Sequence, residues 1–160
     1  MIIKVNKGSF QIVKGQDVEL QTEYVGGGTA LVFVDKNKKI GGICLYVLPY
    51  REYDIELDTG EMVLSGESLI PLFCEALKKE DPDFKNGRFI IIGKACYKEG
   101  PAELDLSFVN FKLAKGMLKK FLIEEVEVIL KEDLNCRFYI GVDIASGKVK
   151  LYLDQKVEEL

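Results

Sequence analysis

The chain has 160 residues, of which 48% are hydrophobic and 30% charged, and a net charge of −4. This length suits one domain, 1–160, with a core of its own. The negative charge argues against nucleic acid, whose binding depends on Lys and Arg neutralising phosphates. No apolar run approaches the roughly 18 residues of a membrane span, and the first residues lack the apolar stretch of a signal peptide. The expected location is the cytoplasm.

The sequence has no histidine, and its cysteines lie far apart without a C-x-x-C pair. A zinc site is therefore not expected, and neither is another metal or cofactor. Because His is the commonest general base, a hydrolase with this composition needs an Asp, Glu or Lys of strongly shifted pKa. In a cytoplasmic domain the cysteines are expected to be reduced and mostly buried. They are Cys44, Cys74, Cys96 and Cys136.

The N-terminal residues predict short strands. Two runs, Ile2–Val5 and Phe10–Val13, alternate apolar and polar residues on either side of Lys7-Gly8-Ser9, which suits a hairpin or an edge pair. The alternation returns over Val18–Tyr24, which predicts a half-buried strand.

A glycine-rich stretch then predicts two consecutive strands. Gly26–Gly28 leads into the apolar run Thr29–Val34, and a polar turn, Asp35–Lys39, separates it from a second apolar run, Ile40–Leu48, closed by Pro49. The glycines indicate a tight turn or bulge. A phosphate-binding loop is rejected, because such a loop leads into a helix and this one leads into a strand.

Apolar residues at helical spacing predict a first helix over 68–79, after an acidic surface loop over Tyr50–Gly60 that has room for a short strand. With Ser68 as the N-cap residue, Pro71 falls at the third helical position, where a missing N–H loses no helical bond. A start at Ser65 would place the same proline in the helix interior, at a cost of about 3 kcal/mol.

The second half of the chain predicts strands around one more helix. Arg88–Ala95 is a buried strand, followed by a loop over Cys96–Asp105 and a helix over 111–122 with Asn110 as N-cap. Val126–Leu130 is a further strand.

The C-terminal residues predict a hairpin and a frayed tail. Arg137–Asp143 and Lys148–Leu153 pair across Ala145–Gly147, and the acidic tail Gln155–Leu160 frays. The predicted fold class is α/β (α+β), a single-domain layered sandwich of mixed and antiparallel β-sheets with two main helices.

The stretch Thr22–Pro49 resembles the CheD family, the chemoreceptor glutamine deamidases of bacterial and archaeal chemotaxis. In that family a Thr precedes a Gly-Ser-Cys turn, a strand ending in Asp, a Gly, and a His followed by an apolar pair and Leu-Pro. Laid on this chain without a gap, these residues fall on Thr22, Gly26-Gly27-Gly28, Asp35, Gly41, Leu45 and Leu48-Pro49. Further matches at Gly93, Ala95 and Asn110 extend the resemblance over Val18–Leu153. It implies a CheD-like fold.

The resemblance also implies a chemistry that this chain has lost. In the family a Cys thiolate attacks the glutamine carboxamide, a His activates it and a Thr orients the His. Those positions are Gly28, Leu45 and Thr22 here, and neither glycine nor leucine supplies a nucleophile or a base. The expected function is that of an inactive homologue that binds chemoreceptor helices or a CheC-type phosphatase of the response regulator CheY. The candidate binding residues are Tyr24, Gly26, Gly27, Gly28, Tyr46, Tyr50, Gly93 and Lys94.

Two alternatives remain open. The first is an active protein-glutamine amidohydrolase with a rebuilt site that uses Thr29, Cys44 or Cys96. Cys44 would face away from Leu45 on a regular strand, Thr29 would need a bulge to face the site, and Lys94 near Cys96 would lower a thiol pKa. The second is a structural or oligomerisation domain that meets an unrelated partner through exposed strand edges.

Overall fold

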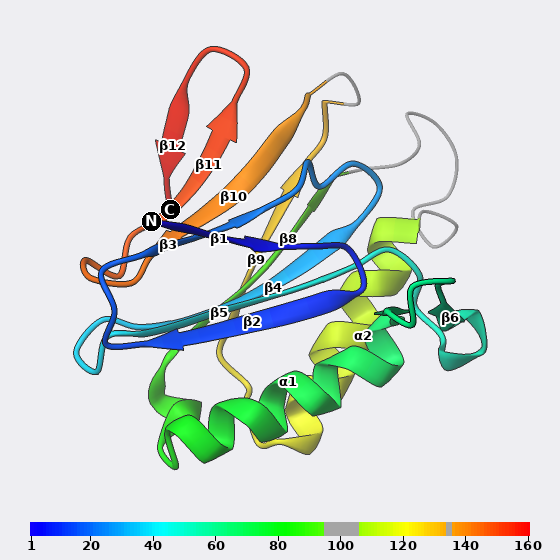
Figure 1. Ribbon diagram of the computed structural model, residues 1–160, viewed down its shortest axis with the longest axis horizontal. Helices are drawn as coiled ribbons and strands as arrows, with labels where there is room; N and C mark the ends of the chain where they lie inside the picture. Colours follow the sequence, from blue (N-terminus) through cyan, green and yellow to red (C-terminus); the bar gives the residue numbers. More distant parts are fainter. Residues whose placement is uncertain (95–105, 134–135) are drawn as a thin grey trace.

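The computed structural model describes residues 1–94, 106–133 and 136–160. Within these ranges the chain forms three layers: two five-stranded β-sheets packed face to face, and a pair of helices on the outer side of one sheet (Figure 1). Each sheet is antiparallel except for one parallel pair. This arrangement confirms the predicted α+β sandwich with two main helices.

Sheet A consists, in spatial order, of β1 (Ile2–Val5), β3 (Glu19–Thr22), β10 (Phe138–Asp143), β11 (Val149–Leu153) and β12 (Val157–Glu159). Sheet B consists of β2 (Ser9–Lys14), β5 (Ile40–Tyr46), β4 (Thr29–Asp35), β8 (Arg88–Lys94) and β9 (Val126–Lys131). The main helices are α1 (Gly66–Glu80) and α2 (Leu106–Lys120). The remaining elements are the 3₁₀ turns η1 (Arg51–Tyr53) and η2 (Phe84–Asn86) and a small sheet of β6 (Ile55–Glu56) and β7 (Met62–Val63).

Sheet B is buried on both of its faces, which explains why its central strands read as continuous apolar runs. Along β4, Ala30 and Val32 pack toward sheet A, whereas Leu31 and Phe33 pack toward the helices. Helix α1 lies against β2 and β5, and α2 lies against β4 and β8. None of the helices in the described ranges is long and apolar enough to span a membrane.

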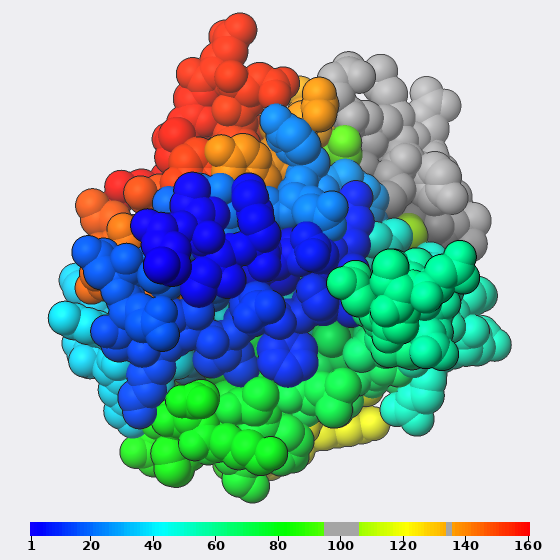
Figure 2. Space-filling view, in the orientation of Figure 1, coloured from blue at the N-terminus to red at the C-terminus, as the bar shows by residue number. Residues whose placement is uncertain are grey.

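The two N-terminal runs form strands, but the predicted hairpin between them is wrong. Strand β1 pairs in parallel with β3 in sheet A, whereas β2 pairs with β5 in sheet B. Gly8, at a φ of 80°, turns the chain from one sheet to the other. Figure 2 shows this segment in dark blue across the front of the molecule, between the C-terminal residues in red and α1 in green. Alternation indicates a strand but does not specify the strand with which it pairs.

Helix α1 begins earlier than predicted. Ser65 rather than Ser68 is its N-cap residue, and the Ser65 hydroxyl accepts a hydrogen bond from the Ser68 amide at 3.3 Å. Asp54 reinforces this end, because its carboxylate accepts from the Ser65 amide at 2.7 Å and from the Ser68 hydroxyl at 2.5 Å. Pro71 consequently lies inside the helix, where its missing N–H leaves the Glu67 carbonyl without a helical donor.

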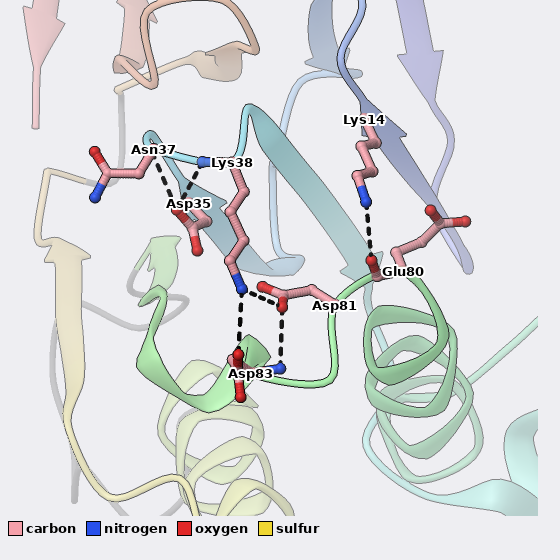
Figure 3. Close-up of polar contacts among 7 residues, drawn as sticks. All are labelled: Lys14, Asp35, Asn37, Lys38, Glu80, Asp81 and Asp83. Carbon is pink, nitrogen blue, oxygen red and sulfur yellow. Dashed lines mark hydrogen bonds and ion pairs between the residues drawn. The ribbon is translucent and has the colours of Figure 1, made fainter.

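The other end of α1 is joined to sheet B by charged side chains (Figure 3). The C-cap residue Asp81 accepts hydrogen bonds at Oδ1 from Lys38 Nζ at 2.7 Å and from the Asp83 amide at 3.0 Å. Lys38 belongs to the turn between β4 and β5. From β2, Lys14 Nζ donates to the Glu80 carbonyl at 3.3 Å, which satisfies one of the last carbonyls of the helix.

Helix α2 begins at Leu106, so the prediction of Asn110 as its N-cap residue is wrong. Asn110 lies within the helix and is fully buried, and its side-chain amide donates to the Val47 carbonyl at 2.9 Å. The side chain thus bonds to the end of a neighbouring strand instead of to its own helix. The predicted loop Cys96–Asp105 lies outside the described residues.

The predicted C-terminal hairpin is confirmed, but the tail after it does not fray. β10 and β11 pair across Ala145–Gly147, whose glycine has a φ of 72°. The tail forms β12, which pairs with β11. Leu160 packs partly against the core between the sheets, and its carbonyl accepts from Arg88 Nη1 at 3.0 Å. Lys131 of β9 lies 2.8 Å from the Glu158 carboxylate, so the tail touches both sheets.

Candidate functional site

Of the three positions that the CheD resemblance makes equivalent to the catalytic residues, Gly28 and Leu45 lie at one end of the strand pair β4–β5, whereas Thr22 ends β3 of sheet A. The residues before β4 form a tight turn, in which Gly26 has a φ of 55° and the Gly28 amide donates to the Val25 carbonyl at 2.8 Å. β4 and β5 pair with Ala30 opposite Leu45. Gly28 therefore lies at the same end of sheet B as Leu45, with the Tyr46 carbonyl close to its Cα.

Thr22 uses its hydroxyl for structure. The side chain is 1% exposed, its Oγ1 accepts from the Ile140 amide at 3.0 Å, and its hydroxyl donates to the Glu23 carbonyl at 2.7 Å. These bonds join the end of β3 to β10 and occupy the hydroxyl. Thr22 therefore has no hydroxyl proton left with which to orient a catalytic base.

The turn at Gly28 is too tight for a cysteine side chain. A Cβ built on Gly28 would lie 2.9 Å from the Val25 carbonyl oxygen and 3.1 Å from that of Tyr46. Leu45 is fully buried and packs in the core between the two sheets. The position thus contains neither a nucleophile nor a base, and its space is closed by backbone and aliphatic side chains.

Asp35, a further residue of the resemblance, caps the turn between β4 and β5. Its Oδ1 accepts from the amides of Asn37 at 3.1 Å and Lys38 at 3.2 Å (Figure 3). This is the local side-chain-to-backbone bonding for which Asp is favoured in turns.

Cys44 has neither the position nor the ionisation state that a substitute nucleophile requires. It is buried among the residues that pack toward the helices, whereas Leu45 packs toward sheet A. Burial, and then the nearby Cys74, raise the pKa of Cys44 well above its ordinary value. Burial likewise raises the pKa of Cys74 to about 12. Both groups are thiols at neutral pH, and the thiolate is the nucleophile. Cys96 lies outside the described residues.

Thr29 belongs to a small buried polar cluster under the glycine turn. It is fully buried on the side of β4 that faces the helices, opposite Tyr46, whose hydroxyl donates to the Asn110 carbonyl at 2.9 Å. Thr29 Oγ1 and Asn110 Oδ1 have no hydrogen-bond partner within the part of the chain that the structure describes. The hydroxyl has no route to solvent, which counts against a substrate reaching it.

The candidate binding residues are only partly on the surface. Tyr24 and Tyr50 are each 45% exposed, but Tyr46 and Gly93 are buried, so neither of the latter offers a contact to a partner. Lys94, at the end of β8, is half-buried and donates to the Cys136 carbonyl at 3.1 Å. In the glycine turn, Gly27 is exposed, Gly26 half-buried and Gly28 buried.

Tyr24 is one member of an aromatic surface on the outer side of sheet A that the sequence interpretation missed. The Tyr24 ring meets the Tyr139 ring edge-on at 5.7 Å, and Tyr139 stacks on Tyr152 at 4.6 Å between centroids. Two cations lie over the rings, the Arg137 guanidinium 4.3 Å from the Tyr24 centroid and Lys4 Nζ 5.6 Å from that of Tyr139. We call these five residues the tyrosine face.

The tyrosine face is held in place by polar and steric contacts. Burial, and then a hydrogen bond from its hydroxyl to Glu19, raise the pKa of Tyr152. A Cβ at Gly141 would lie 2.6 Å from Tyr152 Cε2, so the glycine lets that ring lie flat on the sheet. These contacts hold the Tyr152 ring, on which Tyr139 stacks, against the outer side of sheet A.

A signal for this surface was present in the sequence. The predicted hairpin across Ala145–Gly147 pairs Tyr139 directly with Tyr152, and cross-strand neighbours on one face are in contact. Reading that register, instead of only the positions of the strands, would have brought the two rings together.

The described residues include no group of three or more His, Cys, Asp or Glu side chains that could hold a metal ion. In comparisons with known proteins, no family model matches the chain and no curated protein matches it.

Proposed function

We propose that this chain is a cytoplasmic CheD-like protein that binds partners without catalysis, and that the partners are chemoreceptor helices or a CheC-type phosphatase. The observation that carries the proposal is the state of the family's catalytic positions. Gly28 and Leu45 provide no nucleophile and no base, and the Thr22 hydroxyl is bonded to backbone on both sides. The strands that carry these positions, β3, β4 and β5, are formed and paired, and a fold without reactive groups can still bind a partner.

The tyrosine face supports a binding role. Tyr and Arg are the residue types enriched at protein interfaces and among their hot spots. Here Tyr24 and Arg137 are exposed next to the glycine turn, and their ring and guanidinium are already stacked. Because these side chains already contact each other in the free chain, ordering them against a partner should cost less conformational entropy.

Binding is tested with the full chain, a chemoreceptor cytoplasmic fragment and a CheC-type phosphatase from the same organism, by titration calorimetry. We expect one of the two to bind, and Tyr24→Ala to weaken the complex by about tenfold or more. Tyr53→Ala is the matched control, because Tyr53 is 46% exposed but lies on η1, outside the tyrosine face. Absence of binding to both partners would overturn the proposal.

The alternative, an active amidohydrolase with a rebuilt site, is tested separately. The receptor fragment is incubated with the chain, and mass spectrometry follows the conversion of glutamine to glutamate together with ammonia release. We expect no conversion, since Cys44 is a buried thiol and Thr29 is enclosed. Conversion that is lost in Cys44→Ala, Thr29→Val or Cys96→Ala would show that the chain is an enzyme.

A further inference from the structure

Strand β9 is an open edge of sheet B. It pairs with β8 on one side, and no other described strand pairs with its outer side. Ile129 faces inward and packs against the core between the sheets. Val128 and Leu130 point to the helix side of the sheet, but α2 lies over β4 and β8 and leaves them 39% and 41% exposed.

This edge differs from the other three outer strands of the two sheets. β1 has four residues and β12 has three, and short edges pair poorly with another chain. β2 has no large apolar side chain that is strongly exposed. β9 has six residues, neither Pro nor Gly, and two exposed apolar side chains side by side on one face. An edge of this kind is a template for another strand.

The side chains of β9 are complementary to those of a second copy of the same strand. In an antiparallel pair centred on Ile129, Glu127 of each copy lies opposite Lys131 of the other, and Val128 lies opposite Leu130. A shift by two residues in either direction breaks both Glu127–Lys131 pairs, and in one direction it brings Glu125, which lies outside β9, opposite Lys131. A shift by one residue is excluded, because it would place residues that face the helices in one copy opposite residues that face sheet A in the other.

Within one copy, each charged residue of this edge already lies next to a charge of opposite sign. Arg88 holds Glu127 through two hydrogen bonds, at 2.6 and 2.9 Å, and Glu158 lies 2.8 Å from Lys131. Glu127 is still 51% exposed, so it can also meet a second cation. In the paired arrangement a row of charges crosses the contact. Arg88 and Glu127 of one copy are followed by Lys131 and Glu158 of the other, so that each charge lies next to one of opposite sign.

We propose that two copies of this chain associate through antiparallel pairing of their β9 edges, centred on Ile129, so that the two copies of sheet B form one continuous sheet. The contact covers five residues of each strand, which is small for a protein interface. The dimer is therefore weak and dissociates on dilution. It leaves the tyrosine face of sheet A free, so it is independent of the partner binding proposed above.

The proposal is tested by sedimentation equilibrium over a range of concentrations up to the millimolar level. The wild-type chain is expected to dimerise, and Glu127→Lys and Lys131→Glu are each expected to weaken the dimer by roughly tenfold or more, since each places two like-charged pairs in contact. An equimolar mixture of the two variants restores opposite charges at both positions and should regain wild-type affinity as a heterodimer. Glu52→Lys, an exposed charge reversal on η1, is the matched control and should leave the dimer unchanged.

Because Glu127 and Lys131 also contact Arg88 and Glu158 within the chain, the melting temperature of each variant is measured beside its mass. The double variant Val128→Thr, Leu130→Thr removes the apolar pairs without these contacts and should also weaken association. A wild-type chain that stays monomeric at every concentration would overturn the proposal. So would folded charge variants whose mixture remains as dissociated as each alone.

Discussion

Two buried threonines near the glycine turn use their hydroxyls in opposite ways. Thr22 donates one hydrogen bond and accepts another, whereas Thr29 Oγ1 has no partner within the described residues. Replacing a hydroxyl by a methyl group of similar shape costs stability only where hydrogen bonds are lost. Where a buried polar atom is unsatisfied, the same change removes a desolvation penalty.

We therefore predict that Thr22→Val lowers the free energy of unfolding by about 1–3 kcal/mol, because it leaves the Ile140 amide buried and unpaired. Thr29→Val should raise it by about 1 kcal/mol. Urea unfolding of the two variants measures both values. A loss of similar size at both positions would show that the Thr29 hydroxyl has a partner, such as a buried water.

The carboxyl groups of Asp54 and Asp81 should make the stability of the protein depend on pH in the acid range. Burial alone would raise the pKa of each carboxyl. At Asp54, however, the hydrogen bonds from Ser68 and Ser65 and the charge of Arg51 together outweigh burial. At Asp81 the hydrogen bonds from Lys38 and the Asp83 amide, together with the charges of Lys38 and Lys14, do the same. Both pKa values therefore lie below the ordinary 3.8. A carboxyl whose pKa is lowered by folding stabilises the folded state above its unfolded pKa, and this contribution is lost as pH falls through the folded value.

The melting temperature should therefore fall as pH drops below 3.8, and the fall should be shallower in Asp54→Asn and Asp81→Asn, which no longer titrate. At neutral pH each substitution should lower the melting temperature by a few degrees. Asp83→Asn is the control, because the Asp83 side chain is 73% exposed and 3.5 Å from Lys38. An acid limb as steep in both variants as in the wild type would contradict this assignment.

At the scale of the element, helix α1 shows what local patterns predict and what they miss. The apolar spacing of its residues predicts the existence of the helix correctly. The predicted start at Ser68 is wrong. It was chosen because a start at Ser65 places Pro71 in the helix interior, and only capping by the serine itself was set against that cost. The bonds from Asp54, which belongs to a different element, favour the start after Ser65. Asn110 is a similar case, since its bond to Val47 joins α2 to the residue that follows β5, which is distant in the sequence.

Because Pro71 lies inside α1, we predict that Pro71→Ala stabilises the protein. Restoring the helical N–H should contribute up to about 3 kcal/mol, and the greater freedom of the unfolded chain should offset up to about 1 kcal/mol of it. Pro82→Ala, in the turn after the helix, should only lower stability, since it changes the unfolded chain alone. Urea unfolding of both variants checks the difference in sign, and a Pro71→Ala variant less stable than wild type would contradict it.

At the scale of the whole molecule, strand positions follow from the sequence, but the assignment of strands to sheets does not. The strands β4 and β5 are adjacent in the sequence and pair with each other. β1 and β2 are also adjacent, yet Gly8 sends them to different sheets. The short alternating patterns of β1 and β2 do not indicate which sheet each strand joins. Tertiary packing makes the choice, and the tyrosine face depends on that choice.

The C-terminal tail joins the two sheets, so we expect its removal to lower the stability of the whole protein. β12 extends sheet A, the Leu160 carbonyl accepts from Arg88 of sheet B, and Leu160 packs partly against the core between them. Deleting residues 156–160 should lower the free energy of unfolding by about 2 kcal/mol or more, from lost apolar burial and lost strand pairing. Val157→Thr is the control, since Val157 is 54% exposed and its change leaves the pairing intact. Hydrogen exchange should become faster in β11, which loses one of its two partner strands, while β4 and β5 at the centre of sheet B should remain the better protected. A deletion variant as stable as wild type would mean that the tail rests on the sheets without holding them together.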